Sequence, residues 1–91
     1  MSTAQDYIHD QVGVILDARQ SIWALRYLAA LTDPDQDSHL RHKARVYKEW
    51  RGHGRKLVFQ WADNLVYPMS ADDRAALREQ VFSLLERGLP A

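Results

Sequence analysis

Two histidines, His39 and His42, lie three residues apart, a spacing at which two imidazoles on one helix can share a metal ion. Asp35 and Asp37 are close enough in the chain to add oxygen ligands. A third strong ligand at motif spacing is missing, however, because His53 lies past the end of the helix, in the Gly52-His53-Gly54 turn. Histidines in a basic helix are more often surface residues, so we predict no metal site.

Catalytic motifs are missing from the sequence as well. We find no Ser-His-Asp signature, no Gly-rich phosphate loop and no metalloprotease box. Two carboxylate clusters, at residues 33–37 and 72–73, each stand at an expected helix start, where capping and the helix dipole explain them. A small helical domain also has little room for a ligand-sized pocket. We therefore predict a protein that is not an enzyme and has no cofactor.

The strongest signal is a basic segment between His39 and Lys56. It holds seven positive charges and one negative charge, whereas the rest of the chain holds five positive and eleven negative charges. The net charge of zero therefore hides a strong segregation, which concerns partners and association rather than fold. The candidate partner-binding or nucleic-acid-binding residues are Arg41, Arg45, Lys48, Trp50, Arg51, Arg55 and Lys56.

Two kinds of partner fit this segment. Helical spacing puts Arg41, Arg45 and Lys48 on one stripe, where they could neutralise the phosphates of a nucleic acid. Tyr47 and Trp50 could then stack on bases of a single strand. An acidic protein surface fits the same charges, and Trp50 favours it because tryptophan is enriched among the anchoring residues of protein interfaces. We predict a protein partner, with a nucleic-acid-binding regulator as the alternative.

Helical periodicity and turn residues divide the chain into four expected helices. They span residues 3–31, 34–51, 55–66 and 70–87. Thr3, Pro34 and Ser70 are suited to helix starts, and Gly52-His53-Gly54 separates the second helix from the third. We predict an all-α fold, either a small four-helix bundle or a related orthogonal packing, with residues 1–91 in a single domain.

The expected core centres on the third helix. Residues 55–66 have the cleanest apolar pattern, so we expect this helix to be the most buried and Trp61 to lie in the core. On the second helix, Leu40, Ala44 and Tyr47 form the predicted inner stripe.

The first expected helix is unusually long. At about 1.5 Å per residue it would span about 42 Å, far more than three short neighbours can cover. Its isoleucines repeat every seven residues with arginines beside them, a pattern typical of coiled-coil seams. We therefore predict a homodimer, with a break near Gly13 or simple extension of the arginines into solvent as alternatives. The predicted self-association residues are Ile8, Ile15, Arg19, Ile22 and Arg26.

The composition also predicts where the protein is located, and the chain as a whole resembles a known kind of protein. The chain has no cysteine, begins with polar residues and contains no apolar run near the roughly 18 residues of a membrane span, so we expect a cytoplasmic protein with no membrane contact. In size, helicity and lack of motifs it resembles the small accessory proteins of phages and mobile elements, which bind and block a host protein. The resemblance is one of kind and implies an inhibitor or adaptor, without assigning a role to any residue.

Overall fold

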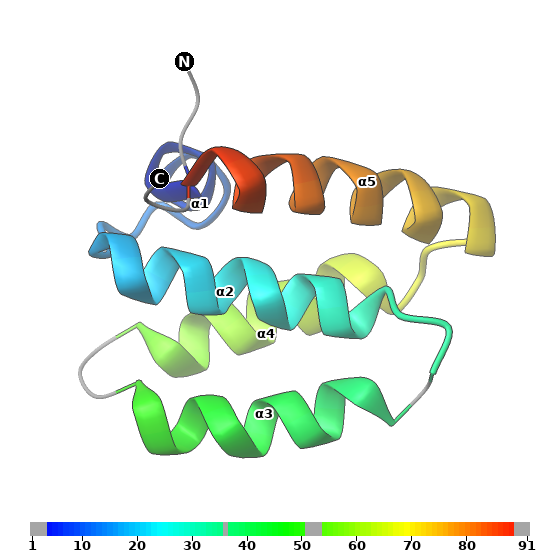
Figure 1. Ribbon diagram of the computed structural model, residues 1–91, viewed down its shortest axis with the longest axis horizontal. Coiled ribbons are helices and arrows are strands. Elements are labelled where there is room, and N and C mark those ends of the chain that lie inside the picture. The colour runs from blue at the N-terminus through cyan, green and yellow to red at the C-terminus, as the bar shows by residue number, and fades with distance from the viewer. Residues whose placement is uncertain (1–3, 36, 51–53, 89–91) are drawn as a thin grey trace.

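Five α-helices and no strands make up the part of the chain that the computed structural model describes, residues 4–35, 37–50 and 54–88 (Figure 1). The fold is all-α, as predicted, and measures 30 × 29 × 25 Å. The prediction of four helices was wrong. The helices are α1 (Ala4–Val12), α2 (Ala18–Leu31), α3 (Ser38–Glu49), α4 (Arg55–Val66) and α5 (Ala71–Gly88).

The expected first helix is divided into α1 and α2, so the prediction of a long first helix was wrong and the alternative of a break near Gly13 is confirmed. Gly13 has a φ of 77°, a left-handed conformation that glycine adopts without strain, and its N–H bonds the His9 carbonyl at 2.8 Å. Asp17 then begins α2 with a complete capping box: its carboxylate accepts from the Gln20 N–H at 2.7 Å, and the Gln20 side chain accepts from the Asp17 N–H at 3.3 Å. A stop signal and a start signal therefore stand four residues apart.

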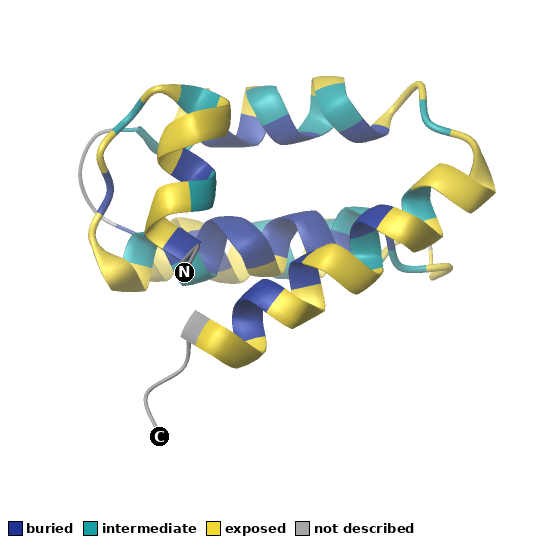
Figure 2. Ribbon diagram, turned by 90° about the horizontal axis from the view of Figure 1, so that it is seen from above, coloured by how far each residue is buried: buried dark blue, intermediate teal, exposed yellow. Residues whose placement is uncertain are grey.

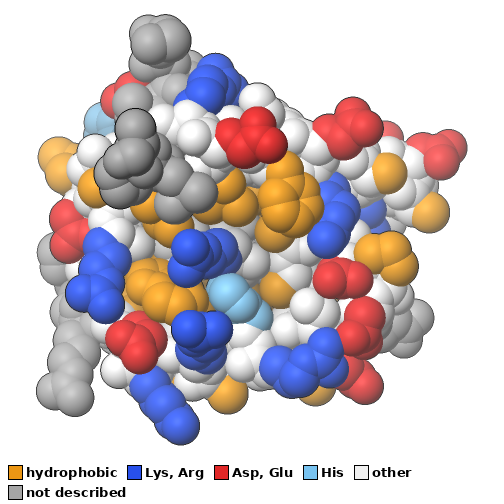
Figure 3. Space-filling view, in the orientation of Figure 1, with side chains coloured by type: hydrophobic (Ala, Val, Ile, Leu, Met, Phe, Trp, Pro, Cys, Tyr) orange, Lys and Arg blue, Asp and Glu red, His pale blue; other side chains and the backbone are white. Residues whose placement is uncertain are grey.

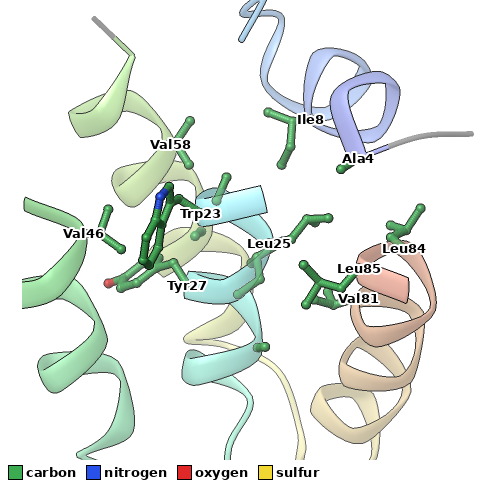
Figure 4. Close-up of a cluster of buried hydrophobic side chains, with 14 of the residues drawn as sticks. Ala4, Ile8, Trp23, Leu25, Tyr27, Val46, Val58, Val81, Leu84 and Leu85 are labelled. Carbon is green, nitrogen blue, oxygen red and sulfur yellow. The ribbon is translucent and has the colours of Figure 1, made fainter. Parts of the chain in front are cut away.

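The central helix is α2, which contacts each of the other four helices. Figure 4 shows Trp23 and Tyr27 on the side of α2 that faces α3 and α4, and Leu25 on the side that faces α5. Most residues of α2 are buried, as expected for a helix packed on several sides (Figure 2). The prediction that the third helix is the most buried was therefore wrong: α4 keeps the predicted bounds, but its Leu57 is exposed and its Trp61 only partly buried.

On α3 the predicted inner stripe was also wrong. Leu40, Ala44 and Tyr47 are exposed, and the helix instead buries Val46 and, at its C-terminal cap, Trp50. Val46 and Trp50 are four residues apart and form one face of a helix as well as the predicted set does. The choice between the two faces depends on where α2 lies, which periodicity alone does not contain.

The remaining connections follow the sequence more closely. Gly54 precedes α4 with a φ of 89°, while Gly52 and His53 of the predicted turn, and the predicted cap Thr3, lie outside the described residues. Ser70 caps α5, as predicted, because its hydroxyl oxygen accepts a hydrogen bond from the Asp73 N–H at 3.2 Å. No helix in the described ranges is long and apolar enough to cross a membrane.

Candidate partner-binding face between α2 and α3

Exposed cations from two helices meet on one side of the molecule. We define the basic face by Arg19 and Arg26 of α2 together with Arg41, Arg45 and Lys48 of α3, all of them exposed. Figure 3 shows basic side chains around a small hydrophobic area over these two helices, with a histidine beside it. The first two arginines were predicted to serve self-association and the other three to bind a partner, so the structure combines parts of two predicted sites.

Trp23 stands at the centre of this face. The guanidinium carbon of Arg26 lies 5.2 Å from the centroid of the Trp23 ring, and that of Arg45 lies 5.7 Å from it, both within cation–π range. The His42 ring lies 5.7 Å from the same indole. We call these four residues the Trp23 cluster. The indole is 8% exposed, because the side chains around it cover its surface.

The five cations of the basic face differ in their partners. Arg19 forms an ion pair with Glu49 at 3.6 Å, and Arg41 forms one with Asp35. The Arg41 guanidinium lowers the pKa of the Asp35 carboxyl, mainly through their hydrogen bond. Across residues 4–35, 37–50 and 54–88, the other three cations have no carboxylate within the 4.0 Å limit of an ion pair. These three are Arg26, Arg45 and Lys48.

The side chain of His42 lies close enough to Arg26 and Arg45 for their positive charges to affect its pKa. Burial, and then the charges of Arg26 and Arg45, lower the pKa of its imidazole below the ordinary value of 6.5. Its Nε2 atom is buried and has no hydrogen-bond partner among the described residues. A protonated ring here would add a third positive charge around one indole, which is why the two arginines disfavour its protonation.

Trp50 and Arg55 belong to a different environment from the one we predicted. Trp50 is only 2% exposed and lies in the core, so it is not the surface anchor that we expected. Arg55 donates from Nη1 to the carbonyl oxygens of Tyr47 at 3.3 Å and Trp50 at 3.2 Å, and its guanidinium stacks on the Tyr47 ring at 4.0 Å. Arg55 thus joins the C-terminal end of α3 to the start of α4. Lys56 is exposed on α4, and Arg51 lies outside the described residues.

The predicted self-association seam is not continuous. Ile8 is completely buried in α1, Ile15 is 79% exposed in the connection after Gly13, and Ile22 is partly buried on α2. The three isoleucines therefore do not line one helix face, because the break at Gly13 changes the direction of the chain between them. Arg19 and Arg26 remain exposed, but Arg19 pairs with Glu49 of α3, and Arg26 lies over the Trp23 ring, which Arg45 of α3 also contacts.

A groove of about 840 Å³ lies between α3 and α4, so the expectation that a domain this small has little room for a ligand-sized pocket was wrong. Tyr27 of α2 lies in it and donates a hydrogen bond to the Asp63 carboxylate at 2.7 Å; burial and that carboxylate raise the pKa of the Tyr27 hydroxyl. Leu40 and Tyr67, at 57% and 86% exposure, border the groove.

The two histidines considered for a metal site have different neighbours. His39 lines the groove, whereas His42 contacts Trp23. No group of three potential metal-ligating side chains occurs among the described residues.

Comparison of the chain with protein-family models, with curated proteins and with solved structures finds no match. The fold and the basic face define a small all-α domain with an arginine-rich, tryptophan-centred surface. Function therefore has to be inferred from the geometry and charge of that surface.

Proposed function

We propose that this protein is a non-enzymatic helical interaction protein, an inhibitor or adaptor whose basic face binds an acidic region of a protein partner. The observation that carries the proposal is the assembly of exposed cations from α2 and α3 around one tryptophan. Arginine and tryptophan dominate the binding energy of many protein interfaces. A surface of one charge also accelerates encounter with a partner of the opposite charge.

A nucleic acid is the second candidate, favoured by the charge of the same face. Three features make it the weaker one. The cations without a carboxylate partner in the described ranges are few on this face, whereas duplex DNA binders commonly contact about 6–10 phosphates. Of the two predicted stacking residues, Trp50 is buried, and the Tyr47 ring, 40% exposed, already carries the Arg55 guanidinium at 4.0 Å. The protein as a whole has no net positive charge.

The decisive experiment compares the wild-type protein with the variant Arg26→Gln/Arg45→Gln/Lys48→Gln. Chemical crosslinking in the native cells, followed by mass spectrometry, should find a partner with an acidic surface that the variant loses. The control Lys56→Gln/Arg87→Gln removes two exposed charges outside the basic face and should retain the partner. In parallel, salt-dependent titration with short DNA and RNA tests the alternative, which predicts a log–log slope near −0.9 per phosphate on duplex DNA. Sub-micromolar, salt-dependent binding of an oligonucleotide by the wild type would exclude the protein-partner assignment.

A further inference from the structure

We propose that Arg26 and Arg45, both stacked on Trp23, form a clamp that binds one carboxylate of an acidic protein segment. The inference rests on the proposed function and names the chemistry that the partner contributes at the centre of the basic face. It gives Trp23 a role as the residue that positions two arginines from different helices.

Two like charges are held beside one ring without a neutralising acid. Arg26 comes from α2 and Arg45 from α3, yet their guanidinium carbons lie 5.2 Å and 5.7 Å from the same centroid. Within the described part of the chain, neither guanidinium pairs with a carboxylate. Repulsion between the two cations is unfavourable, and the indole offsets it only in part. A bound carboxylate would remove that repulsion.

Stacking also prepares the two arginines for binding. A guanidinium that lies against an aromatic ring still presents its N–H edge, and that edge matches the two oxygens of a carboxylate. Because Trp23 already restricts both side chains, less conformational entropy is lost when an anion arrives. The fit is therefore to a planar, bidentate acceptor and depends on arginine rather than on charge alone.

The other arginines of this region serve as internal comparisons. Arg19 and Arg41 share the exposed surface but already contact Glu49 and Asp35. Arg55 already donates to two backbone carbonyls. Within the described residues, Arg26 and Arg45 are thus the arginines of the basic face whose charge-assisted hydrogen bonds remain to be made, and we infer that a partner supplies the acceptor.

The experiment uses a helical peptide that carries glutamates on one face, with a matched peptide in which every glutamate is glutamine. Binding is measured by NMR titration at physiological ionic strength for the wild type, for Arg26→Lys/Arg45→Lys and for Arg26→Gln/Arg45→Gln. The lysine variant keeps the charge of the face and removes the planar, stacked donors. Arg19→Lys/Arg41→Lys is the matched control, because both residues lie on the same face and already have acidic partners. A short single-stranded DNA is the competing probe.

We expect the glutamate peptide to bind, the glutamine peptide not to bind, and the lysine variant to bind about tenfold more weakly than the control. The bound peptide should also raise the pKa of His42, because a carboxylate on Arg26 and Arg45 weakens the repulsion that these charges exert on a protonated imidazole. Circular dichroism confirms that each variant folds, and the single variant Arg45→Lys keeps the comparison if the double variant does not.

Three results would overturn the clamp, and they differ in what they leave standing. If the lysine variant binds like the wild type while the glutamine variant does not, the basic face binds acidic partners by charge alone and only the clamp fails. If the glutamate peptide does not bind the wild type even at millimolar concentration, the clamp and the acidic-partner assignment fail together. If DNA binds more tightly than the glutamate peptide and loses affinity in the same variants, the site recognises phosphate.

Discussion

Two of the arginine–aromatic clusters in the described part of the chain use arginine in opposite ways. One is the Trp23 cluster, and the other, the Trp50 cluster, consists of Trp50, Tyr47 and Arg55. At Trp50 the arginine is Arg55, which stacks on Tyr47 and donates to carbonyls at the C-terminal end of α3. At Trp23, Arg26 and Arg45 cover the indole, and no hydrogen bond from either guanidinium is present in the described ranges.

The difference indicates which arginines stabilise the fold and which are available for a partner. A guanidinium has five N–H donors, and a structural arginine uses them on neighbouring groups of its own chain. An arginine that only stacks keeps its donors for water or for a ligand. Composition and spacing do not distinguish the two cases, since Arg45 and Arg55 both belong to the same basic segment.

The largest expected effect is that of Trp50→Ala on stability. Trp50 is 2% exposed and lies among core residues, so truncation should cost about 3–5 kcal/mol, which is a large share of the stability of a domain this small. Thermal and urea unfolding followed by circular dichroism measure it. Trp61→Ala serves as the comparison: its ring is only partly buried and contacts Tyr7 edge-on at 6.5 Å, so its loss should be clearly smaller. Equal losses would mean that the two rings are equally central.

Arg55→Gln should have the next largest effect. The substitution removes charge-assisted hydrogen bonds to two carbonyls and the contact with the Tyr47 ring, and we expect a loss of about 1.5–3 kcal/mol. Urea unfolding gives the value, and Lys56→Gln, an exposed neighbour on α4, is the control. An Arg55 variant as stable as this control would show that Arg55 does not stabilise the fold, and the contrast between the two clusters would then fail.

The substitutions Arg26→Gln and Arg45→Gln should each cost less than Arg55→Gln. Exposed cation–π contacts contribute about 0.5–1 kcal/mol each, and neither arginine donates a hydrogen bond that the described structure shows. The same unfolding experiment measures both variants beside Arg55→Gln. If either one destabilises the protein as strongly as Arg55→Gln does, its arginine is primarily structural and the distinction between the two clusters disappears.

The sequence predicted the helical class, the bounds of α4 and the cap of α5, because each depends on local periodicity or on one capping residue. It also contained the break at Gly13, since Asp17 and Gln20 form the capping box that the seven-residue isoleucine repeat concealed. The candidate site was only partly predictable. Arg45 was identified from its helical stripe, whereas its neighbour Trp23 comes from a distant part of the chain and becomes a neighbour only through the packing of α2 against α3.

The smallest expected effect is the pH dependence that His42 contributes to stability. Its pKa is lowered in the folded state, so above the ordinary value of 6.5 both states are neutral at this position and it contributes nothing to the pH dependence. As the pH falls through that value, the unfolded chain binds a proton that the folded chain does not bind, and folding becomes less favourable until the pH reaches the lowered pKa.

The melting temperature should therefore fall more between pH 7.5 and 5.5, here roughly one unit on either side of the histidine pKa, in the wild type than in His42→Gln. Because Arg26 and Arg45 add to the lowering, Arg26→Gln/Arg45→Gln should show a smaller slope as well. A slope that is unchanged in both the His42 and the double arginine variants would show that Arg26 and Arg45 do not act on the His42 imidazole, and that the Trp23 cluster lacks the positive potential that a bound carboxylate would neutralise.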